Sequence, residues 1–280
     1  MLAIILSVVL VLVGALLAIV LFRLDQATNL IQDQKDQLEQ QKDLIDKKET
    51  FGTAMSQLLD TAQKFEGVKF GDAVPLDDYQ ALATRAWSHR WNAASVVQDT
   101  AQVTSDIQAL DDLLASAAAD AASNSTGSAN EAVIDSLGGG FVTSVFDDVH
   151  TLCSADALGC VVSDNPYLVH FDAADNGLPW MNDTIRTGLA YHEFAHTLQF
   201  TNPAPTDVAV ASFGGDVETM ADCFALTFDD GWKLHHTIFT SSVEYYEVDV
   251  GYGYTCDESQ RQVIRDWYAG LGIRVQPITQ

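Results

Sequence analysis

A histidine, a glutamate and a second histidine occur together in the segment "HEFAH", residues 192–196. Residues four apart lie on one face of an α-helix, so the imidazoles of His192 and His196 can converge on a single metal ion. Glu193 is rotated by about 100° around the helix from His192 and can reach a water held by that ion. Zinc lowers the pKa of such a water to about 7, and a carboxylate can then take its proton during attack on a carbonyl. The segment therefore predicts a hydrolytic Zn2+ site, although a pair of packing histidines is the alternative for this short pattern alone.

A third ligand is available in "ETMAD", which begins at Glu218, 22 residues after His196. Glu218 and Asp222 are also four apart and share a face if this segment is helical. Glu218 can supply a third protein ligand and leave the fourth tetrahedral position to water, as a catalytic zinc site requires. Asp222 can accept the free ring N–H of a histidine ligand, for which we expect His192. The alternative is a solvated acidic face, but apolar neighbours such as Met220 indicate partial burial.

The two segments together resemble the gluzincin metallopeptidases, which carry H-E-x-x-H and E-x-x-x-D on two helices. The wording "HEFAHTLQF…ETMADCFA" is also similar to bacterial neutral zinc metallopeptidases with a short catalytic domain. The resemblance covers residues 160 to 230 or so. It implies a set of roles: metal ligands His192, His196 and Glu218, general base Glu193, and Asp222 as support for a ligand. No H-x-x-G-x-x-H extension follows, which disfavours the metzincin branch.

The same resemblance implies a zincin-like α+β fold, with a small mixed sheet packed on the active-site helix. In such an arrangement an edge strand binds an extended peptide by main-chain hydrogen bonds. The segment "YLVHF" (167–171) is the candidate for that strand. Gluzincins often also use a downstream His or Tyr to stabilise the oxyanion. The spacing does not choose among the candidates, which are His235, His236, Tyr245, Tyr252 and Tyr254.

Helices and strands with clear signals must position these residues. "DTIRTGLAYHEFAHTLQF" predicts a helix capped by Asp183 or Thr184 and ended by "TNPAPT". A Gly-Gly turn and a capping Asp216 predict a second helix over 214–228, and a last helix should run from Asp257 to Gly270 or Gly272. "GCVVS" and "PYLVHFDA" have strand composition. We assign His89, His150 and His170, which lack a partner motif, to packing or surface positions.

The N-terminal part of the chain predicts an anchor and a stalk. Residues 1–22 contain no charged side chain and are long enough to span a bilayer, whereas a cleaved signal peptide is the alternative. Leu24, Ile31, Leu38 and Ile45 recur every seven residues in a polar helix that could form a coiled-coil homodimer or a solvated stalk. We expect a transmembrane anchor at 1–23, a helical stalk at 24–50 and a zincin-like domain at 51–280. Its 79–122 segment is helical in composition, and "SNSTGSAN" (123–130) is a loop.

Four cysteines and a strong negative charge indicate where the body of the protein works. The even count predicts two disulfides in an oxidising compartment, and among three possible pairings we expect Cys153–Cys160 and Cys223–Cys256. Four buried thiols are the alternative, and Arg23 after the apolar span weakly favours a cytoplasmic body. The net charge of −25 with only 14 Lys and Arg disfavours a nucleic-acid partner and indicates a solubilising surface.

These observations predict a membrane-anchored zinc metallopeptidase that hydrolyses peptide or protein substrates, with its catalytic domain outside the cytoplasm. Two alternatives stay open at this point. One is a non-catalytic zincin-like binding module on a membrane-anchored stalk. The other is a zinc amidase that acts on cell-wall peptides.

Overall fold

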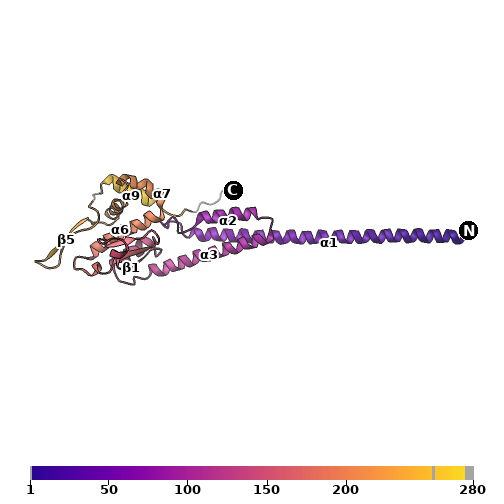
Figure 1. The fold of residues 1–280 in the computed structure, drawn as a ribbon, viewed down its shortest axis with the longest axis horizontal. Helices are drawn as coiled ribbons and strands as arrows, with labels where there is room; N and C mark the ends of the chain where they lie inside the picture. Colours follow the sequence, from indigo (N-terminus) through magenta and orange to yellow (C-terminus); the bar gives the residue numbers. More distant parts are fainter. Residues whose placement is uncertain (1, 254–255, 275–280) are drawn as a thin grey trace. The chain divides into compact units, whose positions relative to one another are not determined.

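The computed structural model describes residues 2–253 and 256–274, with side chains from residue 12 onward. It combines helices with two small sheets, in agreement with the expected α+β class (Figure 1). The chain forms two compact units. The first contains residues up to 56 and 78–104, and the second contains 57–77 and 105–280. The predicted boundaries at 23 and 50 remain predictions.

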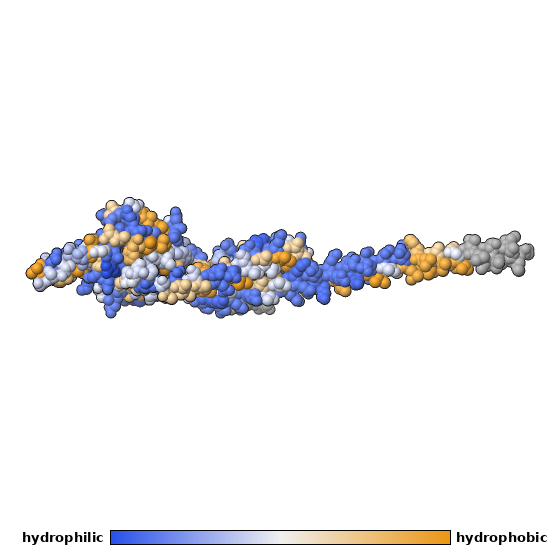
Figure 2. All heavy atoms as spheres, turned by 90° about the horizontal axis from the view of Figure 1, so that it is seen from below, coloured by the Kyte–Doolittle hydropathy of each residue, from blue (hydrophilic) through white to orange (hydrophobic). Residues whose placement is uncertain are grey.

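The first unit is helical. It contains most of the long helix α1 (Leu2–Gln63), helix α2 (Leu76–Ser88) and the first part of α3 (Ala93–Ala121). A window of α1 that begins at Leu12 is long and apolar enough to cross a membrane, and none of it is buried. Figure 2 shows this apolar stretch followed by the hydrophilic remainder of the helix. A signal sequence passes the same test of length and composition, so the anchor itself remains a prediction.

The expected continuous helix over 79–122 is interrupted at residues 89–92. The interruption is explained by Asn92, whose side-chain oxygen accepts the backbone N–H groups of Ala94 and Ser95, each at 3.1 Å. An asparagine that satisfies free N–H groups in this way starts a new helix. His89 pairs with the buried Asp99 at 3.5 Å, in keeping with the packing position expected for it.

In the second unit, a three-stranded mixed sheet has the order β1 (Thr143–Asp147), β3 (Leu168–Asp172), β2 (Gly159–Val161). Strand β3 runs parallel to β1 and antiparallel to β2. The expectation that "YLVHF" forms an edge strand is therefore wrong, because this segment supplies the central strand. Val169 and Phe171 point from β3 into the core, whereas His170, on the opposite face, bonds Asp147 across to β1 at 2.8 Å.

Helices pack against this sheet and against one another around a large hydrophobic core, and a smaller buried cluster includes Ile185 of α6 and Trp232. The contacts join α4 to α6 and β1, α6 to β2 and β3, and α8 to both α6 and α9. The core includes Phe171 of β3, Phe194 and Leu198 of α6, Phe224 of α8 and Trp267 of α9. The bounds of the helices are α4 Ala129–Gly138, α5 Val149–Leu152, α6 Asp183–Thr201, α7 Pro203–Ala209, α8 Val217–Phe228 and α9 Glu258–Gly270, with 3-10 turns η1 at Asp175–Gly177 and η2 at Val210–Phe213.

The predicted helix ends agree closely with the structure. Asp216 caps α8 by accepting the N–H groups of Glu218 and Thr219, and Asp257 caps α9 with a full capping box. The cap of α6 is Asn182, one residue before the predicted Asp183. "TNPAPT" ends α6 as expected, but Pro203 then begins α7, which suits a proline at the first position of a helix.

A second, two-stranded sheet was not predicted. It is a hairpin of β4 (His235–Phe239) and β5 (Tyr245–Asp249), which are paired antiparallel. Its side chains alternate between exposed and partly buried positions along both strands. His235, which pairs across the hairpin with Asp249 at 2.7 Å, holds the strands together near their base.

The structure confirms both expected disulfides. Cys153–Cys160 connects the end of α5 to strand β2. Cys223–Cys256 connects α8 to the segment before α9 and closes a loop with a sequence separation of 33 residues. A crosslink over a loop of this length stabilises the folded chain by about 3–4 kcal/mol through the lost entropy of the unfolded state.

The loop over 123–130 is tied to α4 by one carboxylate, and this contact gives a stability prediction. Glu131 accepts N–H and O–H bonds from Ser125 at 2.7 and 2.8 Å, and it accepts two more bonds from Thr126. Burial raises the pKa of Glu131, but these hydrogen bonds outweigh burial and hold the pKa below its ordinary 4.5. The Glu131→Gln variant should lose about 1–3 kcal/mol of unfolding free energy at pH 7, measured by urea denaturation.

The pH dependence of this loss follows from the sign of the shift. Because the folded-state pKa is depressed, the stabilisation is complete above the ordinary value of 4.5 and disappears as the pH falls through the folded-state pKa. The difference between wild type and Glu131→Gln should therefore shrink below pH 4.5. A difference that stays constant from pH 7 to the lowest pH at which the chain still folds would assign the loss to packing instead.

Candidate metal centre

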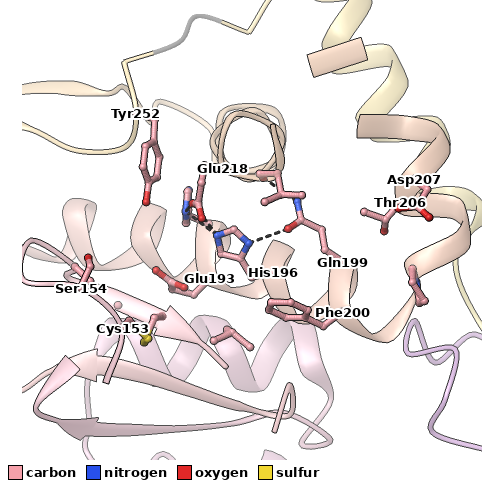
Figure 3. Close-up of a pocket in the computed structure, with 17 residues that line it drawn as sticks. Cys153, Ser154, Glu193, His196, Gln199, Phe200, Thr206, Asp207, Glu218 and Tyr252 are labelled. Carbon is pink, nitrogen blue, oxygen red and sulfur yellow. Dashed lines mark hydrogen bonds and ion pairs between the residues drawn. A yellow bond between two sulfur atoms is a disulfide. The ribbon is translucent and has the colours of Figure 1, made fainter. Parts of the chain in front are cut away.

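Helices α6 and α8 lie side by side and bring the predicted site residues together. His192, Glu193 and His196 occupy the middle of α6 and are nearly buried, at 8%, 3% and 7% exposure. Glu218 lies in the first turn of α8, where the Asp216 cap fixes the start of the helix. Figure 3 shows the Glu218 carboxylate directed at the His196 ring, with Glu193 beside them.

Three potential ligand atoms meet at one point. The Nε2 atoms of His192 and His196 are 3.1 Å apart, and the Glu218 Oε2 lies 3.3 Å from the first and 3.0 Å from the second. Two ligands of a tetrahedral zinc ion, each at about 2.0–2.1 Å from the metal, are about 3.4 Å apart. The triangle therefore has nearly the size that three zinc ligands require.

The outer nitrogens of both imidazoles show which atoms face the centre of this triangle. His192 Nδ1 is 2.9 Å from Asp222 Oδ1, the support predicted for this ligand. His196 Nδ1 is 2.8 Å from the Gln199 Oε1, and the Gln199 Nε2 donates to the Val217 carbonyl at 3.0 Å, which fixes the amide orientation. Each Nδ1 atom thus faces an acceptor oxygen, and each Nε2 faces the carboxylate oxygen of Glu218 and is the ring atom that could bind a metal.

Two imidazole nitrogens and a carboxylate oxygen this close to one another could hold a shared cation. Without a metal, the pKa of His192 is raised and the pKa of Glu218 is lowered, so a positive charge is favoured between the ligand atoms. Burial lowers the pKa of His192, but hydrogen bonds with Asp222 and Glu218 outweigh burial and raise it to about 10. Burial raises the pKa of Glu218, but hydrogen bonds with the two imidazoles hold it well below its usual range. Two imidazoles and a carboxylate form a donor set that suits Zn2+.

Gln199 is a site residue that the sequence analysis missed. The available signal was its position three residues after His196, one turn further along the same face of the helix. Its amide carries the same function for His196 that Asp222 carries for His192. Gln199 also connects α6 to the backbone at the start of α8.

Removing the Gln199 oxygen should weaken metal binding. We expect Gln199→Met to lower zinc affinity by about 10- to 100-fold, since partners that orient a ligand contribute on this scale. Competition against a chromophoric chelator on the purified full chain measures the change. Gln199→Glu keeps an oxygen opposite His196 Nδ1 and should retain most of the affinity. Equal losses in both variants would assign Gln199 to helix packing alone.

Glu193 lies beside the triangle without belonging to it. Among the described residues its Oε2 is buried and has no hydrogen-bond partner. Strand β2 packs directly on its side chain, since a Cβ atom added at Gly159 would lie 2.9 Å from the Glu193 Oε1. Burial raises the pKa of Glu193, while the charges of His192 and His196 act in the opposite direction. An unpaired, nearly buried carboxylate next to a metal centre fits a group that exchanges a proton with a reactant.

Tyr252 is the one of the four described oxyanion candidates that lies at this centre. Its backbone N–H donates to the Asp222 Oδ2 at 2.7 Å, and its ring stacks on His192 with a centroid distance of 6.0 Å. The preceding Gly251 has φ +79° and leaves no room for a Cβ next to the Asp222 carboxylate. Burial, followed by the negative charge of Glu218, raises the pKa of Tyr252 to about 12.

The three other described oxyanion candidates lie away from the centre. His235, His236 and Tyr245 belong to the β4–β5 hairpin, and Tyr254 lies outside the described residues. His150 lies between two acids, 3.9 Å from Asp172 and 3.5 Å from Asp175. Asp148, His150 and Asp172 form a second group that could hold an ion, but Asp148 and His150 are exposed.

Two cavities adjoin the centre. The first, of about 440 Å³, extends from His192, Glu193 and His196 along the end of α6 to α7. The second, of about 390 Å³, extends from the same centre toward Trp232 and the base of β5. Cys153 and Cys160 line the first cavity, so one disulfide forms part of its wall. Open space therefore adjoins the candidate metal centre on both sides.

Comparison with known proteins adds no assignment. No family model, curated protein or solved structure matches this chain.

Proposed function

We propose that the chain is a zinc metallopeptidase of the gluzincin type. One observation carries the proposal: two imidazole Nε2 atoms and a carboxylate oxygen from two neighbouring helices converge within 3.0–3.3 Å of one another. His192, His196 and Glu218 would hold the zinc ion, and Asp222 and Gln199 would orient the imidazoles. Three protein ligands leave a position for water or substrate, which distinguishes a catalytic from a structural zinc.

The arrangement of the sheet supports a zincin-like domain. The mixed sheet packs on α6 through β2 and β3, and β2 is an antiparallel edge strand. Gly159, Cys160 and Val161 of β2 line the first cavity together with Glu193. Strand β2, rather than β3, therefore takes the role of the strand that would bind an extended peptide by main-chain hydrogen bonds.

The residues around the centre have separate tasks in hydrolysis. A bound Zn2+ lowers the pKa of water and polarises a carbonyl oxygen. Glu193 accepts the proton of the attacking water and can later deliver it to the leaving amine. The Tyr252 hydroxyl, like any phenol with an ordinary or raised pKa, is protonated at neutral pH, so it can donate a hydrogen bond to the developing oxyanion.

The position of the base depends on a glycine, which gives a further prediction. Because a side chain at residue 159 would push against the Glu193 carboxylate, Gly159→Ala should displace it. A displacement of about 1 Å can cost about 100-fold in rate. We expect kcat for a peptide substrate to fall by about that factor while zinc content stays equal to wild type. Gly177→Ala, at a glycine with open space around it, is the matched control. Unchanged kcat in Gly159→Ala would contradict the assigned position of the base.

The remaining parts of the chain support a place at a membrane. The two disulfides suit an oxidising compartment. The apolar part of α1 would anchor the chain, and the acidic second unit would act outside the cytoplasm. A cysteine-accessibility assay on intact cells, with a single reporter cysteine in the second unit, tests this orientation.

The proposed activity is tested on the full chain in a neutral detergent. Zinc is quantified by mass spectrometry after purification without chelator, and cleavage of an unstructured protein is followed before and after chelation. The proposal predicts one zinc per chain and activity that chelation removes and zinc restores. A chain that contains no zinc, or that cleaves equally well after complete chelation, would overturn it.

A further inference from the structure

The cleft on both sides of the metal centre is acidic. The two cavities share the residues at the centre, so they form the two arms of one cleft; the shared residues are Ser154, Ala157, Gly159, His192, Glu193 and Tyr252. One arm extends to Asp207 on α7, and the other extends to Asp156 and Asp249. Neither Lys nor Arg occurs among the described residues that line either arm.

Two of these carboxylates are available to a ligand. Asp207 and Asp156 are both exposed. Within the described part of the chain, neither side chain makes a hydrogen bond or an ion pair. Asp249, in contrast, is shared with His235 at 2.7 Å. Each arm of the cleft thus offers one carboxylate that a cationic side chain can pair with.

The arm that leads to Asp207 has an apolar wall, and apolar surroundings strengthen the attraction between Asp207 and a cationic ligand. Its wall between the metal centre and Asp207 includes the half-exposed Phe200 and Val217 and the ring of Pro203. Thr206, next to Asp207, is almost buried, and its hydroxyl has no partner among the described residues. Figure 3 shows Thr206 and Asp207 together on α7, beyond Phe200 and Gln199. An ion pair formed beside apolar surface is screened less than one in open water.

The charge of the whole unit acts in the same direction. Residues 57–77 and 105–280 contain 30 acidic and 7 basic residues, a net charge of −23, whereas the first unit has 9 acidic and 7 basic residues. Almost the entire charge of −25 therefore surrounds the cleft and not the anchor-bearing unit. A field of one sign raises the local concentration of oppositely charged ligands and their association rate by about 10- to 1,000-fold at low salt.

We infer that the cleft selects cationic peptide segments, with Lys or Arg side chains on both sides of the reacting bond that pair with Asp207 and Asp156. The inference rests on the proposed function, since it names the substrate class of that same site. Acidic peptides would be repelled by the two unpaired carboxylates and by the negative charge of the whole unit. The bound peptide would run along β2, through the metal centre and past the end of α6.

The test separates recognition from hydrolysis. Two fluorescent peptides are compared that differ only in Lys or Glu at two positions on each side of the central bond. Their binding to the zinc-loaded full chain with Glu193→Gln, in a neutral detergent, is measured by anisotropy at about 10 mM and at 1 M salt. We expect the Lys peptide to bind at least about 10-fold more tightly at low salt, and this ratio to fall toward one at high salt.

Substitution of single carboxylates shows whether the arm that contains Asp207 binds the cationic side chain. Asp207→Asn should lower the affinity for the Lys peptide by about two- to fivefold, as loss of one exposed ion pair does. Asp164→Asn is the matched control: it removes the same charge from an exposed position of the same unit that lines neither arm. Equal effects of the two substitutions would show that only the overall negative charge of the unit attracts the peptide. This result would overturn the assigned pairing with Asp207.

The outcomes for the two proposals are distinct. Equal binding of both peptides at low salt, or tighter binding of the Glu peptide, overturns the inference even if the wild-type chain cleaves them. Preferential binding of the Lys peptide without cleavage by wild type would support the selection of cationic peptides by the acidic cleft and overturn the peptidase.

Discussion

Replacing Glu193 by Gln should abolish peptide hydrolysis and leave zinc bound. The amide has the shape of the carboxylate and fits the narrow space beside Gly159, but it cannot accept a proton. Glu193 contributes none of the three atoms that form the ligand triangle, so its substitution should change the metal affinity little. A general base contributes about 100- to 10,000-fold, and a base that is almost completely buried should lie in the upper part of this range. We expect kcat to fall by at least about 1,000-fold, measured on zinc-loaded full-length protein.

This substitution also separates the peptidase from a non-catalytic binding module. A module that only binds a partner would keep every function in the Glu193→Gln variant, because the fold and the metal are retained. Glu66→Gln, at an exposed glutamate of the same unit, is the control for a general effect of losing one charge. Retention of hydrolysis in Glu193→Gln, or loss of zinc together with hydrolysis, would contradict the role assigned to this residue.

The core of the candidate site could be predicted from the sequence because helix geometry is local. Spacings of four residues place His192 with His196 and Glu218 with Asp222, whatever surrounds the helices. What the spacing could not supply is the packing of α8 on α6, which brings Glu218 within 3.3 Å of both imidazoles. The sequence analysis offered Glu218 as a third ligand, and the resemblance to gluzincins implied the same role, but only the structure shows that the three atoms meet.

The parts of the site that sequence reasoning missed are those that depend on tertiary contacts. Gly159 has an ordinary conformation and no motif, and its importance arises only because β2 packs against Glu193. Gln199 becomes a partner of His196 because the Val217 carbonyl on another helix fixes its amide. Tyr252 approaches from a segment after the β4–β5 hairpin.

The wrong choice of edge strand has a physical cause as well. His170 and Asp172 alternate with Val169 and Phe171, which is the pattern of a strand with one solvated face. In the structure both polar residues are nearly buried, at 8% and 4% exposure. His170 bonds Asp147, and Asp172 accepts the N–H groups of two following residues. The alternation reports only which face of the strand is polar, so it could not show that β3 is paired on both sides.

Removing one corner of the triangle should remove the metal. His196→Ala leaves one imidazole and one carboxylate, a pair that cannot close a tetrahedral site. Zinc binding by four protein ligands amounts to about 10–16 kcal/mol, so one ligand accounts for about 3 kcal/mol, and affinity should fall at least about 100-fold. Hydrolysis should disappear with the metal, unlike in Glu193→Gln, where the metal stays. Competition with a chromophoric chelator measures the affinity, and His89→Ala, at a histidine of the first unit that pairs with Asp99, is the control. If the His196→Ala variant bound zinc with wild-type affinity, the metal would have to lie elsewhere. Among the described residues, no imidazole besides those of His192 and His196 belongs to this triangle.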